Sequence, residues 1–323
     1  MEITKLKTAG QAVGTSKKGK VKAFLYSKNI IRNYDLYLLL IPVIAFYIIF
    51  CYGPMYGLQL AFKDFVATKG ITGSPWVGFK HLSRFMGSPY FLRLIGNTLG
   101  ISVAQLVFGF PVPIILALMI NEVQNTFFKK LVQNITYAPH FLSLVVLVGM
   151  VKIFTNRDYG LINYMIEVLG GTRIDFMQSA GWFRPLYVIS GIWQSAGWGS
   201  IIYIAALAGI DIQLHESAKI DGAGRFQRIW YINLPGILPT IVILLILNVG
   251  KLMNVGFEKA FLMQNDLNLS ASDIIATYSY RIGIQGAQYS YATAIGLFNS
   301  VVNCVLLLTI NSISRKVSES SLW

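Results

Sequence analysis

The sequence predicts an all-α integral membrane protein with six transmembrane helices. Of its 323 residues, 54% are hydrophobic and 13% are charged, whereas a soluble domain carries roughly 25% charged residues. The mean hydropathy of +0.57 also indicates a membrane protein. Six windows contain no Asp, Glu, Lys or Arg, and each is long enough to cross a bilayer as a helix. These windows are 36–62, 94–121, 131–151, 185–210, 229–250 and 282–314.

The expected spans lie within or close to these windows, at about 36–58, 96–120, 132–154, 186–208, 237–256 and 291–313. The windows are continuous apolar runs without sustained alternation, which excludes a membrane barrel. A basic polar tail, 1–35, precedes the first span, which is too long for a signal peptide and should be retained. The transmembrane domain is expected at 36–314, with a polar loop at 211–235 and a second tail at 315–323.

The distribution of Lys and Arg predicts that both termini face the cytoplasm. In this orientation the cytoplasmic segments hold 15 of the 27 basic residues, chiefly in the N-terminal tail. The segments 61–93, 156–184 and 257–290 then become external loops, and Lys259 counts among their charges. We attribute the net charge of +13 to contact with anionic membrane lipid rather than to nucleic-acid binding.

No motif for catalysis or metal binding is present in the sequence. There is no H-E-x-x-H, no G-x-S-x-G and no pair of cysteines at metal-binding spacing. The nearest match to a phosphate-binding loop is Gly14 with Gly19 and Lys20, but Val21 follows where a hydroxyl is required. We therefore expect no enzymatic activity, no metal and no cofactor on this chain. Any nucleotide chemistry must reside on another chain.

The polar loop 211–235 has the pattern of two short helices joined by a turn. Asp211 stands where the first helix could begin, and Asp221-Gly222 indicates its end and a sharp turn. The segment 225–232 resumes helical periodicity, and Leu234-Pro235 is expected to stop it and return the chain to the membrane. Such an element fits either a groove on a partner protein or the lipid surface. The residue pattern alone leaves both open.

The same loop resembles the signature loop of ATP-binding-cassette importer permeases, which reads Glu-Ala-Ala, a spacer, Gly, a longer spacer and Ile-x-Leu-Pro. The matching residues here are Glu216, Ser217, Ala218, Gly222, Ile232, Leu234 and Pro235, with Ser217 replacing an alanine. Asp221, Ala223 and Pro239 fit the carbohydrate-importer version. The stretch from about Arg32 to Lys316 is similar to oligosaccharide permeases related to the maltose permeases, and more narrowly to the polysaccharide branch.

The resemblance implies a type I importer permease fold and a set of partners in the cell membrane. These are a second homologous permease, two ATPase subunits that carry ATP and Mg, and an extracytoplasmic solute-binding protein. The loop would be the coupling helix, with Glu216 meeting basic groups on the ATPase and Gly222 forming the turn. The full implied coupling set is Glu216, Ser217, Ala218, Asp221, Gly222, Ala223, Leu234 and Pro235. ATP need only favour one conformation over another.

A candidate substrate path follows from polar residues within the spans. Lys251 lies late in the fifth expected span, with Asn248 and Asn254 at helical spacing around it. Weaker candidates are Trp193, Gln194, Asn299 and Asn303. A charge within a span usually faces a polar cavity, although Lys251 could instead extend to the membrane interface. If Lys251 faces the path, an acidic oligosaccharide such as a uronate polymer fragment becomes the favoured substrate.

The resemblance therefore implies an oligosaccharide importer permease that couples ATP hydrolysis on a separate subunit to alternating access. One alternative is a self-contained channel or an ion-coupled secondary transporter. Intramembrane carboxylates would favour it, and the six windows have none. A membrane-embedded enzyme would need clustered His, Asp or Glu at the interface, and the sequence shows no such cluster.

Overall fold

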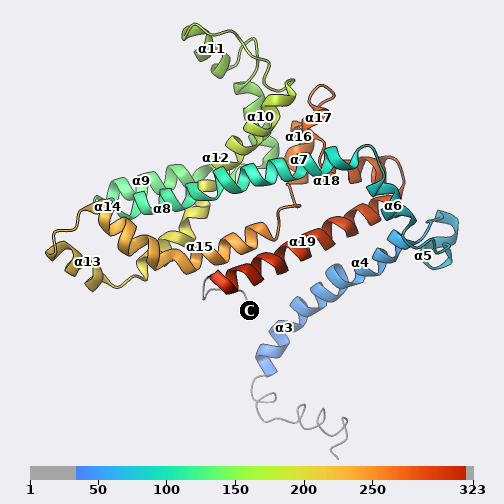
Figure 1. Cartoon of the computed structure of the whole chain (residues 1–323), viewed down its shortest axis with the longest axis horizontal. Coiled ribbons are helices and arrows are strands. Elements are labelled where there is room, and N and C mark those ends of the chain that lie inside the picture. The colour runs from blue at the N-terminus through green and yellow to red at the C-terminus, as the bar shows by residue number, and fades with distance from the viewer. Residues whose placement is uncertain (1–33, 318–323) are drawn as a thin grey trace, which may run out of the picture. The chain divides into compact units, whose positions relative to one another are not determined.

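The computed structural model describes residues 34–317, and these residues form helices without a β-strand (Figure 1). The all-helical prediction is therefore confirmed for the described part of the chain, whereas nearly all of the basic tail 1–35 lies outside it. The chain divides into two units, Met1–Leu58 and Gln59–Trp323. The first contains α3 (Tyr34–Phe46), a π-helical segment η1 (Tyr47–Tyr52) and α4 (Gly53–Met55), and none of their residues is buried.

The second unit contains the remaining helices, which Figure 1 colours from blue-green to red. After η2 (Tyr56–Phe62), which begins within the first unit, its helices are η3 (Ala67–Lys69), α5 (Gly70–Gly73), α6 (Lys80–Met86), α7 (Phe91–Ala104), η4 (Gln105–Gly109), α8 (Pro111–Asn121), α9 (Thr126–Tyr137), η5 (Ala138–Phe141), α10 (Leu144–Phe154), α11 (Leu161–Val168), α12 (Ala180–Ala208), α13 (Ile212–Ile220), α14 (Arg225–Arg228), η6 (Ile229–Asn233), α15 (Leu234–Val249), α16 (Phe257–Met263), α17 (Leu269–Ser272), α18 (Ile275–Tyr280), η7 (Arg281–Gln285) and α19 (Tyr289–Val317).

Helix α12 is the centre of the second unit, because α7, α8, α9 and α15 all pack against it. Its C-terminal half joins α8 and α15 in a cluster of buried residues that includes Ala117, Tyr203 and Ile237. Its N-terminal half packs with α7, α10 and α16 through Phe183 and neighbouring buried residues. Helices packed side by side around one long helix are what a polytopic membrane protein requires, since each backbone amide is satisfied within its own helix.

The number of helices able to cross a membrane agrees in part with the predicted six. Within residues 34–317, four helices are long and apolar enough to span alone: Tyr34–Phe62, Phe91–Asn121, Arg225–Val249 and Tyr289–Arg315. Two bent pairs raise the count to as many as six. One pair, Ala180–Ala208 with Ile212–Ile220, is bent by 74°, and the other, Thr126–Phe141 with Leu144–Phe154, is bent by 102°.

The expected span over 132–154 is not one straight helix but a bent pair of helices. Pro139 ends α9 in the tight 3-10 turn η5, because proline supplies no backbone N–H and its ring crowds the preceding turn. Ser143 then starts α10 by accepting a hydrogen bond from the Val146 N–H at 3.3 Å. The chain therefore changes direction by 102° inside this apolar window.

The prediction that Leu234-Pro235 stops a helix is also wrong. A single helix runs over Arg225–Val249, with its residues Ile229–Asn233 wound as a π-helix. Pro235 directly follows this π-helical segment and lies in the first turn of α15, so the helix passes through the proline without ending. The second half of the polar loop is thus directly continuous with a membrane-spanning helix.

The expected loop over 257–290 is instead largely helical and partly buried. It contains α16, α17, α18 and the π-helical segment η7. Asp273 is fully buried there, and one carboxylate oxygen lies 2.7 Å from a guanidinium nitrogen of Arg281 and 3.6 Å from one of Arg93. Apolar residues such as Met263 and Ile274 are buried on either side of it. The polar composition of 257–290 predicted an exposed loop. That prediction fails because charged side chains that are paired with each other can be buried.

Candidate substrate cavity and coupling loop

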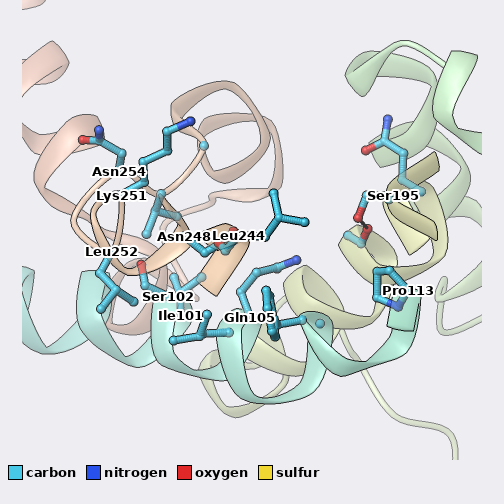
Figure 2. A pocket seen from close by; sticks show the side chains of 18 of the residues that line it. Ile101, Ser102, Gln105, Pro113, Ser195, Leu244, Asn248, Lys251, Leu252 and Asn254 are labelled. Carbon is cyan, nitrogen blue, oxygen red and sulfur yellow. Dashed lines mark hydrogen bonds between the residues drawn. The ribbon is translucent and has the colours of Figure 1, made fainter. Parts of the chain in front are cut away.

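A cavity of about 580 Å³ opens between α7, α8, α12, α15 and the segment that follows α15. Its polar lining includes Gln105, Gln194, Asn248, Lys251 and Asn254. Figure 2 shows Gln105, Ser195, Asn248 and Lys251 around this space, supplied by η4, by α12 and by the end of α15 with the turn that follows it. Its lining contains one lysine and no carboxylate. The electrostatic character of the cavity is therefore neutral to positive.

Four of the residues predicted for the substrate path line this cavity together, namely Lys251, Asn248, Asn254 and Gln194. The expectation that Asn248, Lys251 and Asn254 are spaced along one helix is wrong, because α15 ends at Val249 and the chain then turns. Backbone hydrogen bonds from Lys251 to Asn248 and from Asn254 to Lys251 form consecutive tight turns. The structure brings these side chains to one space through the turns and not through one face of a helix.

The two asparagines predicted on the sixth span hold this turn from behind. Asn299 and Asn303 each donate a side-chain hydrogen bond to the Asn254 side-chain oxygen, at 2.9 and 3.0 Å. The Asn303 side-chain oxygen accepts from the Met253 N–H at 3.0 Å. Neither asparagine lines the cavity, and neither does the half-exposed Trp193.

Lys259, which the sequence pattern does not mark as a site residue, lies behind the cavity wall next to Gly191. It was counted as an external charge, yet only 5% of its surface is exposed. Its ammonium donates a hydrogen bond to the Tyr187 carbonyl at 2.7 Å and lies 4.5 Å from the centre of the Tyr187 ring. Burial lowers the pKa of Lys259 to about 7. The apolar neighbours in the sequence Phe257–Met263 were the available signal that this lysine lies inside the protein.

The polar loop 211–235, called the coupling loop after the resemblance, forms the helix and turn that the sequence predicts. The Asp211 side chain caps α13 by accepting a hydrogen bond from the Gln213 N–H at 2.9 Å. At the other end, Gly222 adopts a φ of +80°, which a side chain would disfavour. The Ala223 N–H donates to the Ala218 carbonyl at 2.8 Å, and the Gly222 N–H to the Lys219 carbonyl at 3.1 Å. This pair of bonds is the Schellman motif that ends helices.

The coupling loop is solvent-exposed and carries large apolar side chains. Ile220 and Phe226 are each 87% exposed, and α13 has no buried residue. Glu216, Ser217 and Asp221 are exposed along the same element. Exposed apolar side chains flanked by charge are characteristic of a surface that another protein or a membrane covers. Leu234 and Pro235 lie apart from this surface, inside the helix that continues into the membrane.

One buried polar contact connects the second half of the loop to a spanning helix. Arg228 approaches the Glu122 carboxylate at 3.6 Å, and both side chains are largely buried. Asn233, which is fully buried, donates to the other Glu122 oxygen at 3.5 Å. Glu122 follows the last residue of α8, so this contact joins the loop to the end of that helix. The sequence analysis did not identify Glu122, since a single acid beside a span gives no signal of its partner.

The described residues contain no group of three or more His, Cys, Asp or Glu side chains that could hold a metal ion. His140 stacks on Trp198 with ring centres 4.5 Å apart, which is a packing contact between η5 and α12. Cys51 and Cys304 are both free thiols. What the fold and site define is a polytopic helical membrane protein with a polar cavity and an exposed loop that carries both charged and apolar side chains.

The chain belongs to the family of binding-protein-dependent transport system inner membrane components, whose model matches residues 109–319. It is 46% identical to the LplB protein of Bacillus subtilis, over 90% of this chain and 92% of that protein. It is 42% identical to the polygalacturonan/rhamnogalacturonan transport system permease protein YteP of Bacillus subtilis, over 95% of each chain.

The solved structures include a chain from a bacterial alginate ABC transporter in complex with an alginate pentasaccharide-bound periplasmic protein. This chain is similar to it with a TM-score of 0.84 and 44% sequence identity, over 91% of this chain and 99% of the other. The chain is therefore a multi-pass inner membrane component with the type I permease fold. The resemblance seen in the sequence is confirmed.

Proposed function

We propose that this chain is the permease subunit of an ATP-driven importer that carries acidic, uronate-containing oligosaccharides. The observation that supports this most directly is the cavity, which combines Lys251 with side-chain amides and has no carboxylate in its lining. Amides suit sugar hydroxyls as hydrogen-bond donors and acceptors, and a lysine in a site of reduced dielectric attracts a carboxylate. The aromatic ring of Tyr187 and that of Tyr203 complete the lining with apolar faces.

The names of the relatives support the same substrate class. YteP is named for polygalacturonan and rhamnogalacturonan transport, and the structural neighbour is an alginate transporter. These polymers share a sugar ring that bears a carboxylate. A common substrate chemistry would explain why the cavity of this chain has a cation where a neutral sugar needs none.

The coupling loop is proposed to seat in a cleft of a separate ATPase subunit. Glu216 would face basic groups of the ATPase, Gly222 would keep the turn, and exposed side chains such as Phe226 would anchor the contact. ATP and Mg would act on two such ATPase subunits. A second homologous permease would complete the membrane part, and an extracytoplasmic solute-binding protein would deliver the sugar.

In this proposal the chain crosses the cell membrane six times, with both termini in the cytoplasm. The tails are 1–35 and 315–323, the transmembrane domain is 36–314, and the loop 211–235 is cytoplasmic. The two bent pairs then count as one span each. The short α13 lies outside the membrane, in keeping with the 74° bend that separates it from α12.

Two experiments test the proposal. Cells that depend on the full-length chain should accumulate a labelled short oligogalacturonate, and deletion of the gene should abolish accumulation. A tagged chain should recover an ATPase and a second permease, and both should be lost with Glu216→Lys or Gly222→Pro. Uptake and ATPase recovery that survive these substitutions would exclude the coupling role of the loop.

A further inference from the structure

A second positive charge lies directly behind the wall of the cavity at Gly191. This glycine, on α12, lines the cavity together with Gln105 and Tyr187. A Cβ atom at position 191 would lie 3.1 Å from the Lys259 ammonium and 3.2 Å from the Gln105 side-chain oxygen. Because glycine has no such atom, no side chain of residue 191 stands between the ammonium and the cavity.

The ammonium of Lys259 has unused capacity to bind an anion. An ammonium has three donors, and the structure gives one hydrogen bond, to the Tyr187 carbonyl. No carboxylate lies within ion-pair distance of it among the described residues, although the exposed Glu258 is its neighbour in sequence. The ion pairs found in the described chain involve other residues. A buried cation without a counter-charge is costly unless something supplies that charge.

We propose that Lys259, Gly191 and Gln105 form a carboxylate-binding niche in the cavity wall, which takes a uronate carboxylate of the transported sugar. The Lys259 ammonium binds the carboxylate through the gap left by Gly191, and the Gln105 side-chain amide donates to it. Lys251 lies on another part of the same cavity, so the cavity offers two cationic positions to a substrate with repeating carboxylates. This inference rests on the proposed transport of acidic oligosaccharides.

The protonation state of Lys259 agrees with this role. With a pKa of about 7, the amine is partly charged at neutral pH when the niche holds no anion. A carboxylate beside it favours the charged form, because an opposite charge offsets the cost of burial. An anionic sugar therefore gains an ion pair that a neutral sugar of the same shape does not.

The test compares an oligogalacturonate with its fully methyl-esterified form, in whole-cell uptake by the full-length protein. Gly191→Ala closes the niche without changing any charge, and the atoms it meets are ends of flexible side chains that can move. Lys259→Gln removes the charge and keeps a polar side chain. Gly149→Ala is the matched control, since its added Cβ meets nothing within 4 Å. Immunoblots of membranes verify that each variant is present at wild-type level.

We expect Gly191→Ala and Lys259→Gln to raise the half-saturation concentration for the acidic sugar by about tenfold or more. The value for the ester should change by less than about twofold, and Gly149→Ala should behave as wild type. An unchanged value for the acidic sugar, or equal changes for both sugars, overturns the niche while leaving transport intact. If wild-type cells take up neither sugar, the proposed function fails instead. If only the acidic sugar is carried, the half-saturation concentrations of Gly191→Ala and Lys259→Gln for that sugar are compared with that of Gly149→Ala, and equal values overturn the niche.

Discussion

At the residue scale, Lys259 shows how burial changes the chemistry of a side chain. Its pKa in the folded protein is about 7, whereas the pKa of a lysine in an unfolded chain is about 10.4. Between these values the unfolded chain binds more protons than the folded one, so stability must rise with pH over that window. Below about pH 7 both forms are protonated, and this contribution no longer changes.

Lys259→Met should remove this pH dependence. We expect the unfolding midpoint of the purified wild type to rise by several degrees between about pH 7 and about pH 9, as the buried amine loses its proton. The variant should have a flatter profile over the same range. Lys69→Met, which removes an exposed lysine, should retain the wild-type slope. Equal slopes in Lys259→Met and wild type would show that Lys259 is not the titrating group.

The contrast between Lys251 and Lys259 explains what the sequence could predict of the cavity. Lys251 was identifiable because it lies within the expected span 237–256, directly after an apolar window and close to Asn248, a pattern that favours a cavity-facing charge. Lys259 lies in a stretch that resembles an external loop, and it is buried because α16 packs against α10, α12 and α18. Its apolar neighbours gave a local signal of burial, but the helices that cover it are distant in sequence and gave none.

At the element scale, the contact of Glu122 with Arg228 and Asn233 joins the coupling loop to α8. If the loop moves with its ATPase, this contact transmits the movement to a helix that lines the cavity. Glu122→Gln should therefore reduce uptake several-fold while ATPase recovery persists, since the docking surface is unaltered. Glu167→Gln serves as the control, because its pair with Arg173 is exposed and contributes little. Loss of ATPase recovery in Glu122→Gln would assign Glu122 to docking and not to transmission.

The contact between α12 and α9 depends on a glycine. A Cβ at Gly197 would collide with the Thr136 carbonyl oxygen, which is backbone and cannot move aside alone. Gly197→Ala should destabilise the protein by about 1–3 kcal/mol, the range found for overpacked cores, and so lower its unfolding midpoint in detergent. Gly96→Ala adds the same atom where nothing lies within 4 Å and should leave the midpoint unchanged. An unaltered midpoint in Gly197→Ala would mean that the helices separate at no cost.

Elements that obey local rules were predictable, and those that depend on packing were not. The Asp211 cap and the Gly222 turn follow from side-chain and backbone preferences of single residues. Helix α14 continues into α15 through a π-helical segment that precedes Pro235, and no local sequence pattern predicts such a segment. Within 257–290 the buried Asp273 is paired with Arg281 of the same region and with Arg93 of a distant one, and the distant pairing leaves no mark in the local sequence.

At the scale of the whole molecule, the remaining question is which side of the membrane each loop faces. The excess of Lys and Arg assigned to the cytoplasm depends mostly on the tail 1–35. The proposed coupling role adds a second argument, because an ATPase that uses cellular ATP could meet the loop 211–235 only from inside. Both arguments support the proposed orientation, in which the loop containing Lys69 would lie outside.

Single cysteines test this orientation in a background in which Cys51 and Cys304 are replaced by serine. Lys219→Cys and Lys69→Cys both put the thiol at exposed positions. In intact cells a membrane-impermeant maleimide should label Lys69→Cys and spare Lys219→Cys, and inside-out vesicles should reverse the pattern. Labelling of both from one side would require an even number of spans between them and would contradict the proposed topology, which has three spans there, one for each bent pair and one for Phe91–Asn121. Residue 69 precedes both bent pairs, and residue 219 lies in α13, at the end of the second pair. One accessibility experiment therefore decides the orientation and tests whether the number of spans between the two residues is odd.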